Sequence, residues 1–416
     1  MKAWAWEIAG ALASLGFRFY WIFVRAPAEK FVYSDMDFYV FLSKRMKDPN
    51  FYSNPGHFTH PPGMAWLIRW LGGETGADTP LKVLFLFMSF SIPILIALTA
   101  RKLFDRRAAR FCFWAATLYA PFWMYGSFLI AELPLTFFIS LSVWLAAVLF
   151  CTRVSGMKMR SLACLLGGVA GVSLAFKITP LPGILVLFGG VFWSWRRGWL
   201  SREWVQRVKP ALLVFGLVLA ALSIRGSVGT GKFNLGTNKF PGDFLIGNLG
   251  KMGLFEFQGG GGTWGSPTAA IRGWHGKFSV PQAMWDSDSK TYALHWMREY
   301  PLDVVAMDHL KLQAFLFDPP WPLFVNDDFW NMTQISLFWM STFGYFLALL
   351  GWWTSIRRRE RGGGGFSPET GLLLPVVALM TSLLLTSAEA RYRIPFDPLI
   401  LLLAGSGFSR GILDRS

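Results

Sequence analysis

The sequence is poor in charged residues and in cysteine. Only 16% of its 416 residues are Asp, Glu, Lys or Arg, whereas soluble proteins average about a quarter, and its mean hydropathy is +0.39. This composition excludes an ordinary soluble protein and predicts a chain that lies in a lipid bilayer. The three cysteines, Cys112, Cys151 and Cys164, lie in or beside apolar segments without metal-ligand spacing, so we interpret them as small buried apolar residues.

Several familiar motifs are also missing from the sequence. It has no P-loop, no Gly-rich dinucleotide-binding turn, no GxSxG elbow and no metal-ligand triad of credible spacing. No internal repeat is apparent, which disfavours transporters built from inverted repeats. The N-terminal apolar segment 3–24 lacks an A-x-A-like cleavage site, which predicts a retained first span.

Apolar segments dominate what is present. A bilayer crossing requires about 20 mainly apolar residues, and ten segments are candidates: 3–24, 80–99, 109–126, 127–150, 161–178, 179–195, 210–225, 333–356, 371–388 and 394–409. We therefore expect an all-α polytopic membrane protein of about ten transmembrane helices. The shorter segments would complete their crossing by tilt or local thinning of the bilayer.

The net charge of +15 would suggest a nucleic-acid partner in a soluble protein. Here Lys and Arg are concentrated in four loops, 101–110, 151–160, 195–209 and 356–365. Ten spans with a cytoplasmic N-terminus place all four loops and both termini on the cytoplasmic side, in agreement with the positive-inside rule. The charge then reflects topology, and we expect no nucleic acid as partner.

The same topology leaves two long segments on the opposite, exterior face. Segment 25–79 belongs to a transmembrane core of residues 1–225 and contains two amphipathic stretches that suit helices in the plane of the interface. Residues 226–332 are predicted to form a small exterior subdomain, in which Tyr300-Pro301 separates two helices. Residues 333–416 supply the last transmembrane helices.

Polar side chains near the membrane gather on this exterior face. An ionisable residue at membrane depth is costly and indicates function. Each residue also has a structural alternative: a helix cap for Asp35, the helix dipole for Asp37, a structural ion pair for Glu132, a turn for His60 and interfacial anchoring for Arg391 and Arg393. For Arg18, inside the first span, we expect a structural role. The candidates are Asp35 and Asp37 after the first span, His57 and His60 in the same loop, Glu132 and Lys177 near span ends, and Arg391 and Arg393 in the last exterior turn.

A carboxylate beside several cations at the mouth of a membrane bundle suits sugar transfer from a phosphate-bearing lipid. The cations would hold the phosphate as negative charge develops on it, and the carboxylate would take a proton from the attacking hydroxyl. The main alternative is a transporter or flippase of a lipid-linked sugar, which predicts polar residues across the midplane, where most spans are apolar. No cofactor is expected, although a divalent metal shared by Asp35, Asp37 and His60 is left open.

Several stretches, in this order, resemble a known family. They are Arg18 followed by SDMDFYVFLSKRM, then FTHPPGMAWL, YGSFLIAELPLTFF, FNLGTNKFPGDFLIGN, HWMREYPLDVVAMDHLKLQAFLFDP and EARYRIPFDPLILLLAG. Together they resemble the polyprenyl-phosphate-dependent C-type glycosyltransferases, which share the GT-C fold and include protein O-mannosyltransferases and lipid A aminoarabinose transferases. The similar stretches cover most of the chain.

The resemblance implies roles for the exterior residues. Asp35 would be the general base, and Glu132 would be a second acidic residue of the catalytic site. His60 stands where some members have a lysine, and this departure puts a phosphate contact there in doubt, since histidine is mostly neutral at pH 7. We group as expected substrate- or phosphate-binding residues Asp37, Tyr39, His60, Lys177, Arg391 and Arg393.

The resemblance also implies an activity. It describes a multi-pass enzyme of a bacterial inner membrane, with its active site facing the periplasm or cell exterior and both termini in the cytoplasm. The enzyme would transfer a sugar from a polyprenyl-phosphate-linked donor, such as an undecaprenyl phosphate sugar, to a lipid, glycan or protein acceptor, with inversion at the anomeric carbon. Its partners would be this donor, the acceptor and the surrounding membrane lipids.

Overall fold

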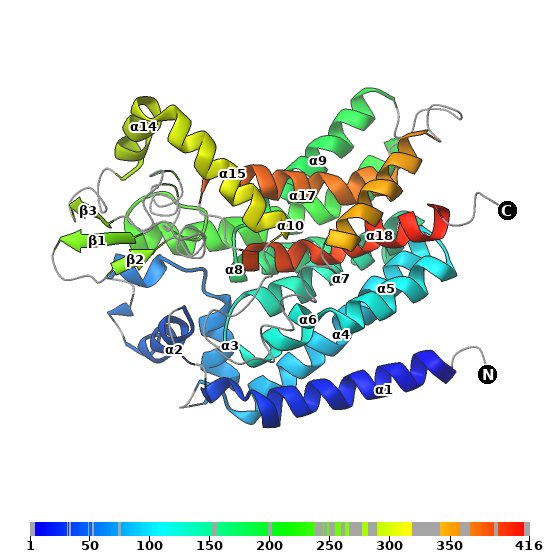
Figure 1. Cartoon of the computed structure of the whole chain (residues 1–416), viewed down its shortest axis with the longest axis horizontal. Helices are drawn as coiled ribbons and strands as arrows, with labels where there is room; N and C mark the ends of the chain where they lie inside the picture. The colour runs from blue at the N-terminus through cyan, green and yellow to red at the C-terminus, as the bar shows by residue number, and fades with distance from the viewer. Residues whose placement is uncertain are drawn as a thin grey trace.

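The computed structural model is a bundle of helices with smaller elements gathered at one end (Figure 1). It describes most of the chain, and its description is interrupted mainly between residues 238 and 288, 318 and 341, and 358 and 366. Within the first of these gaps three short strands are described. The described ranges are 5–30, 35–48, 54–73, 76–151, 156–198, 202–237, 289–317, 342–357, 367–386 and 390–411, with a few isolated residues between them.

Each of the ten predicted apolar segments contains helix, which confirms a helical membrane protein. Within the described residues, five helices are long and apolar enough to cross a bilayer by themselves, and the total of ten crossings stays a prediction. The bundle helices are α1 (Ala5–Tyr20) continued by η2 (Trp21–Arg25), α4 (Thr79–Leu103), α5 (Arg106–Leu118), α7 (Glu132–Cys151), α8 (Gly156–Phe176), α9 (Leu181–Arg196), α10 (Arg202–Thr230), a helix at 342–357, α17 (Pro368–Leu385) and α18 (Asp397–Gly411).

Small residues let α8 and α10 approach closely. Gly167 and Gly171, four positions apart on α8, face α10, and a Cβ atom added to Gly171 would lie 2.7 Å from the Cβ of Val218. Helix association in lipid depends on this kind of close van der Waals packing, because lipid tails are as apolar as the side chains themselves. The two glycines thus position α8 against α10, and Lys177 follows the last residue of α8.

Arg18 takes the structural role expected of it. Its guanidinium is buried, and its Nε donates to Ser89 Oγ on α4 at 3.0 Å. Ser89 donates in turn to the carbonyl of Phe122 at 2.6 Å, within the short helix α6 (Ala120–Met124). A buried charge is tolerated when hydrogen bonds satisfy it, and this chain of bonds ties α1 to α4 and α6.

The smaller elements lie at the end of the bundle where α2 (Asp35–Arg45) and α3 (Gly63–Leu71) are found (Figure 1). The helices α14 (Ser289–Glu299) and α15 (Pro301–Phe317) are separated at Tyr300, as predicted from the following proline. A three-stranded sheet of order β2-β1-β3 lies at 254–281, where β1 (Leu254–Gln258) pairs antiparallel with β2 (Thr263–Gly265) and parallel with β3 (Lys277–Pro281).

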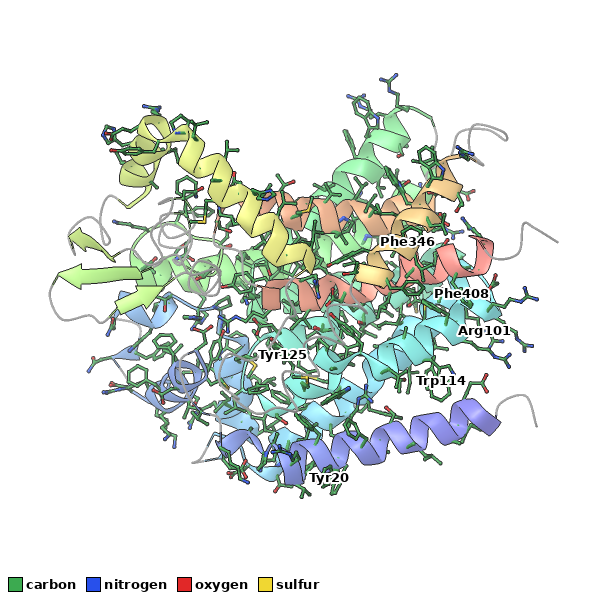
Figure 2. The ribbon with its side chains drawn as sticks, in the orientation of Figure 1. Tyr20, Arg101, Trp114, Tyr125, Phe346 and Phe408 are labelled. Carbon is green, nitrogen blue, oxygen red and sulfur yellow. The ribbon has the colours of Figure 1, made fainter. Side chains whose placement is uncertain are left out.

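The opposite end of the bundle carries the first residues of α1 and the last residues of α18 (Figure 1). Arg101, near the end of α4, lies at this same end together with Phe408 of α18 (Figure 2). The predicted grouping of the two chain ends with the basic loop 101–110 is therefore present in the fold.

Candidate active site

Two carboxylates and two cations form one connected ion-pair cluster, which we call the carboxylate–cation cluster: Asp35, Glu132, Lys177 and Arg391. Arg391 Nη2 lies 3.0 Å from Asp35 Oδ2, and Arg391 Nε lies 3.8 Å from Glu132 Oε1. Lys177 Nζ donates to the same Glu132 oxygen at 2.7 Å. All four had been expected at one membrane face, and the structure brings their side chains together.

Every member of the cluster stands at the end of an element. Asp35 is the first residue of α2, and Glu132 is the first residue of α7. Lys177 follows the last residue of α8, and Arg391 lies in η7 (Ala390–Phe396), the 3-10 segment before α18. Carboxylates are favoured at helix N-termini, where the helix dipole is positive, so the local structure supports the same arrangement that the ion pairs require.

The cluster is neutral in formal charge and unevenly buried. Two carboxylates are balanced by one ammonium and one guanidinium. The side chain of Glu132 is 2% exposed, whereas those of Asp35, Lys177 and Arg391 are 17% to 18% exposed. Because a buried charge is tolerated only with close partners, the two cations offset the charge of Glu132, and Asp35 with Arg391 forms the more accessible side.

Tyr392 completes the cluster on its inner side. The Nζ of Lys177 lies 3.9 Å from the centre of the Tyr392 ring, and the Cζ of Arg391 lies 5.6 Å from it. The ring is buried, and cation–π attraction strengthens when the cation is shielded from water. Sequence reasoning did not identify this residue. The signal available was its place between two arginines in the stretch ARYRIPF.

His60 and Tyr39 lie beside Asp35. The Nε2 of His60 is 3.7 Å from Asp35 Oδ1, and the His60 ring packs against the rings of Phe38 and Tyr39. Burial, followed by the negative charges of Asp35 and Glu132, raises the pKa of Tyr39 well above its usual value. The Tyr39 hydroxyl therefore stays protonated at the edge of the cluster.

The loop that carries His60 is held from two sides. Thr237 Oγ1 donates to the carbonyl oxygen of Thr59 at 2.6 Å, so the chain after α10 is attached to this loop. On the other side, Gly63 stands against α8, where an added Cβ atom would lie 2.7 Å from the carbonyl oxygen of Ala175. The HPPG stretch is thus a close-packed junction between α3 and the end of α8.

Three candidate residues lie apart from the cluster. Asp37 is exposed, because two residues along an α-helix rotate the side chain by about 200° away from that of Asp35. Arg393 is fully buried in another network, where its Nε lies 3.0 Å from Asp397 Oδ1 and its Nη2 donates to the hydroxyl of Tyr119 at 3.2 Å. His57 is buried as well, and its Nδ1 lies 2.9 Å from the carbonyl oxygen of Phe51.

The second network fastens the last helices together. Arg393 Nη1 donates to the carbonyl of Phe315 on α15 at 3.0 Å, and Tyr119 donates to Asp397 Oδ2 at 2.5 Å. It therefore joins α15, Tyr119 at the end of α5 and the start of α18. Its central residue, Arg393, is two positions after Arg391 in the chain. Asp397 and Tyr119 were not predicted, although a carboxylate inside the apolar segment 394–409 was a usable signal.

The three residues considered for a shared metal do not converge. Asp35 and His60 are neighbours, but Asp37 is directed away from them. Within the part of the chain that the structure describes, no group of three or more His, Cys, Asp or Glu side chains is arranged to hold a metal ion. The carboxylates of the cluster instead face Lys177 and Arg391.

The fold of the whole chain is similar to solved structures of the oligosaccharyltransferase AglB from Archaeoglobus fulgidus. For its complex with an inhibitory peptide and a dolichol-phosphate, the TM-score is 0.55 and the identity is 11%, over 99% of this chain and 51% of that chain. For the form tethered to an acceptor peptide, the TM-score is 0.53 and the identity 13%, over 99% and 50%. This chain therefore spans about half the length of the archaeal protein.

ArnT from Cupriavidus metallidurans, bound to undecaprenyl phosphate, matches with a TM-score of 0.42 and 15% identity, over 99% of this chain and 79% of that chain. No family model and no curated protein sequence matches the chain. The likeness to the archaeal structures shows the fold, and the GT-C fold that the sequence resemblance implied is confirmed.

Proposed function

We propose that this protein is a membrane glycosyltransferase that moves a sugar from a polyprenyl-phosphate-linked donor to a lipid, glycan or protein acceptor. The observation that carries the proposal is the carboxylate–cation cluster. It places a partly exposed carboxylate, Asp35, 3.0 Å from a guanidinium, with a lysine close by. The attacking hydroxyl of the acceptor needs a group that takes its proton, and the leaving phosphate needs positive charge beside it. The cluster supplies both.

The cluster has a residue for proton acceptance and residues for charge compensation in the transfer. The acceptor hydroxyl gives its proton to Asp35 as its oxygen forms a bond to the anomeric carbon of the sugar. The bond from that carbon to the carrier phosphate breaks, and its electron pair goes to the phosphate oxygen. Arg391 and Lys177 offset the charge that develops there. Direct displacement of this kind inverts the anomeric carbon.

Glu132 and Tyr392 would hold the two cations in place during this step. Glu132 is buried and contacts both Lys177 and Arg391, while the Tyr392 ring lies against both of them. Pre-oriented charges stabilise a transition state better than mobile ones, because they need no rearrangement during the reaction. The fold adds support, since the archaeal oligosaccharyltransferase that shares it has a structure in complex with a dolichol-phosphate, which is itself a polyprenyl phosphate.

We also propose that the cluster faces the periplasm or exterior of a bacterial inner membrane, with both termini in the cytoplasm. Support comes from the basic end of the bundle, where Arg101 lies (Figure 2). Arginines near helix ends also stack on aromatic rings, as Arg197 does on Trp193 at 4.9 Å and Arg410 on Phe104 at 5.6 Å. Positive charge beside interfacial aromatic residues is typical of the cytoplasmic boundary.

Incubation of the purified protein with a panel of polyprenyl-phosphate sugars tests the proposal. We expect one donor to be consumed, with release of its carrier phosphate, and we expect Asp35→Asn to abolish this consumption. Asp48→Asn is the matched control, because Asp48 lies on the turn after α2 and pairs there with Arg45 at 3.6 Å, outside the cluster. Wild-type rates with Asp35→Asn would contradict the assignment, and transport of an intact donor without cleavage would favour the flippase.

A further inference from the structure

The groups that would bind the donor phosphate are already occupied by carboxylates. Arg391 is paired with Asp35 at 3.0 Å, and Lys177 is paired with Glu132 at 2.7 Å. The same Asp35 is the proposed base. The cluster as it stands is therefore a self-paired arrangement, in which a cation needed for the donor and the base needed for the acceptor neutralise each other.

We propose that the donor phosphate exchanges with Asp35 on Arg391, so that donor binding releases the base and precedes activation of the acceptor. This inference rests on the proposed function and adds an order of events to it. The exchange needs no further group, because the phosphate brings the negative charge that Asp35 gives up.

The difference in burial indicates that the Asp35–Arg391 ion pair, and not the Glu132–Lys177 ion pair, is the one that the donor phosphate breaks. Asp35 and Arg391 are each 17% exposed, whereas Glu132 is 2% exposed. The Asp35–Arg391 pair is therefore the more accessible of the two pairs, and partly exposed ion pairs are weakly held. Glu132 keeps its contacts with Lys177 and with the Nε of Arg391, so that Arg391 stays in place while its Nη2 changes partner.

The geometry of the two anions favours the exchange. A guanidinium presents its N–H groups as a planar fork that matches phosphate oxygens as well as carboxylate oxygens. The Nη2 of Arg391 donates to Asp35 Oδ2. A phosphate can take that nitrogen and contact Lys177, whose side chain is 18% exposed, whereas the short Asp35 side chain is tied to α2.

Release from Arg391 changes what Asp35 can do. A carboxylate that accepts charged N–H groups binds a proton weakly, and loss of those contacts makes it a better base. Charged and titratable groups near Asp35 include His60, whose Nε2 is 3.7 Å away, Tyr39 with its protonated hydroxyl, and the more distant Glu132 with its partner Lys177. Once the guanidinium has changed partner, the carboxylate is available to the acceptor hydroxyl.

The same exchange explains how the cycle closes. After transfer, Asp35 carries the acceptor's proton and cannot pair with Arg391, while the carrier phosphate has become a monoester with more negative charge. Loss of the proton from Asp35 to water restores its charge, and the carboxylate then competes again for Arg391. Re-formation of the 3.0 Å pair then offsets part of the free energy needed to release the carrier phosphate.

Binding of undecaprenyl phosphate to the full-length protein in detergent, followed by tryptophan fluorescence, tests this exchange. Because Asp35→Asn removes the competing charge, we expect it to bind the lipid about two- to fivefold more tightly than the wild type. Asp35→Glu keeps a carboxylate and should bind like the wild type, as should the control Asp48→Asn. Thermal unfolding of each variant in detergent verifies that it is folded.

A double-mutant cycle shows whether the effect passes through Arg391. Arg391→Ala should weaken binding, and adding Asp35→Asn to it should change the affinity no further, because the competition for the guanidinium has been removed. The exchange is overturned if Asp35→Asn binds equally or more weakly, or if it gains the same factor without Arg391. A wild-type protein that binds no undecaprenyl phosphate would contradict the proposed function as well. If the wild type consumes the donor but Asp35→Asn does not bind undecaprenyl phosphate more tightly than the wild type, the exchange alone is contradicted.

Discussion

Lys177 lies against the face of Tyr392, with its Nζ 3.9 Å from the ring centre and 2.7 Å from Glu132. The ammonium is thus fixed between a buried carboxylate and a buried aromatic ring. The same ring lies 5.6 Å from the guanidinium of Arg391. One aromatic side chain therefore helps to position both cations proposed to hold the phosphate.

Replacement of Tyr392 by leucine should lower kcat/KM by roughly three- to thirtyfold, the effect of losing a shielded cation–π contact. Tyr392→Phe keeps the ring and should remain close to the wild type. Initial rates of donor consumption measure the difference. An equal loss in the phenylalanine and leucine variants would show that the hydroxyl, and not the ring, is what matters.

Loss of Arg391 should mainly lower activity, whereas loss of the carboxylate partner of Arg393 should mainly lower stability. Asp397→Ala leaves the fully buried Arg393 without its carboxylate partner, and loss of a partner from a buried ion pair typically costs about 3–5 kcal/mol. We expect a large fall in the thermal unfolding temperature in detergent. Arg391→Ala should abolish donor consumption with a smaller fall in that temperature, because its pair with Asp35 is partly exposed and Glu132 keeps Lys177 as a partner. A stable Asp397→Ala variant would contradict the anchoring role of this network.

Gly63→Ala should disturb the cluster from outside it. The added Cβ atom would lie 2.7 Å from the carbonyl oxygen of Ala175, so α3 must move away from the end of α8, two residues before Lys177. We expect a loss of stability of about 1–3 kcal/mol together with a several-fold lower rate of transfer. Gly216→Ala is the control, since a Cβ atom there meets nothing within 4 Å. Equal behaviour of the two variants would rule out the close contact.

The raised pKa of Tyr39 predicts that the wild type and Tyr39→Phe differ in stability at alkaline pH. Its pKa in the folded protein is raised by burial and by the charges of Asp35 and Glu132, whereas an unfolded tyrosine has a pKa of about 10. The unfolded chain therefore releases this proton first as the pH rises, and the stability contributed by protonated Tyr39 is present below about pH 10 and lost above it. The wild type should lose stability above pH 10 more steeply than Tyr39→Phe, as measured by thermal unfolding between pH 8 and 11. Parallel curves would contradict the buried, protonated hydroxyl.

The sequence was sufficient to group Asp35, Glu132, Lys177 and Arg391, because apolar segments and loop charge determine on which face a residue lies. It was not sufficient to say which neighbours point the same way. Asp37 and Arg393 each follow a cluster residue by two positions, and two residues rotate the side chain by about 200° in an α-helix and about 240° in a 3-10 helix. The direction of a side chain depends on where its helix begins, which composition does not encode.

The network around Asp397 was missed for a different reason. The predicted span 109–126 is broken after Leu118, because the chain is extended at Tyr119 ahead of Pro121. Proline has no N–H for the helical hydrogen bond to the residue four positions earlier, and its ring clashes with that carbonyl group, so α5 cannot continue through Pro121. This break directs Tyr119 toward Asp397, 278 positions later, and a contact over that separation leaves no local trace in the sequence.

The distance along the chain between Asp35 and Arg391, 356 positions, has a consequence for biosynthesis. The ribosome delivers Asp35, Glu132 and Lys177 to the membrane long before η7 and α18 are made. Until then the assembled part holds two carboxylates and one ammonium, a surplus of one negative charge that repels the phosphate of a lipid-linked sugar. Insertion of the last helix brings the missing guanidinium. The carboxylate–cation cluster therefore reaches charge balance, and with it the proposed donor site, only after η7 and α18 have been inserted.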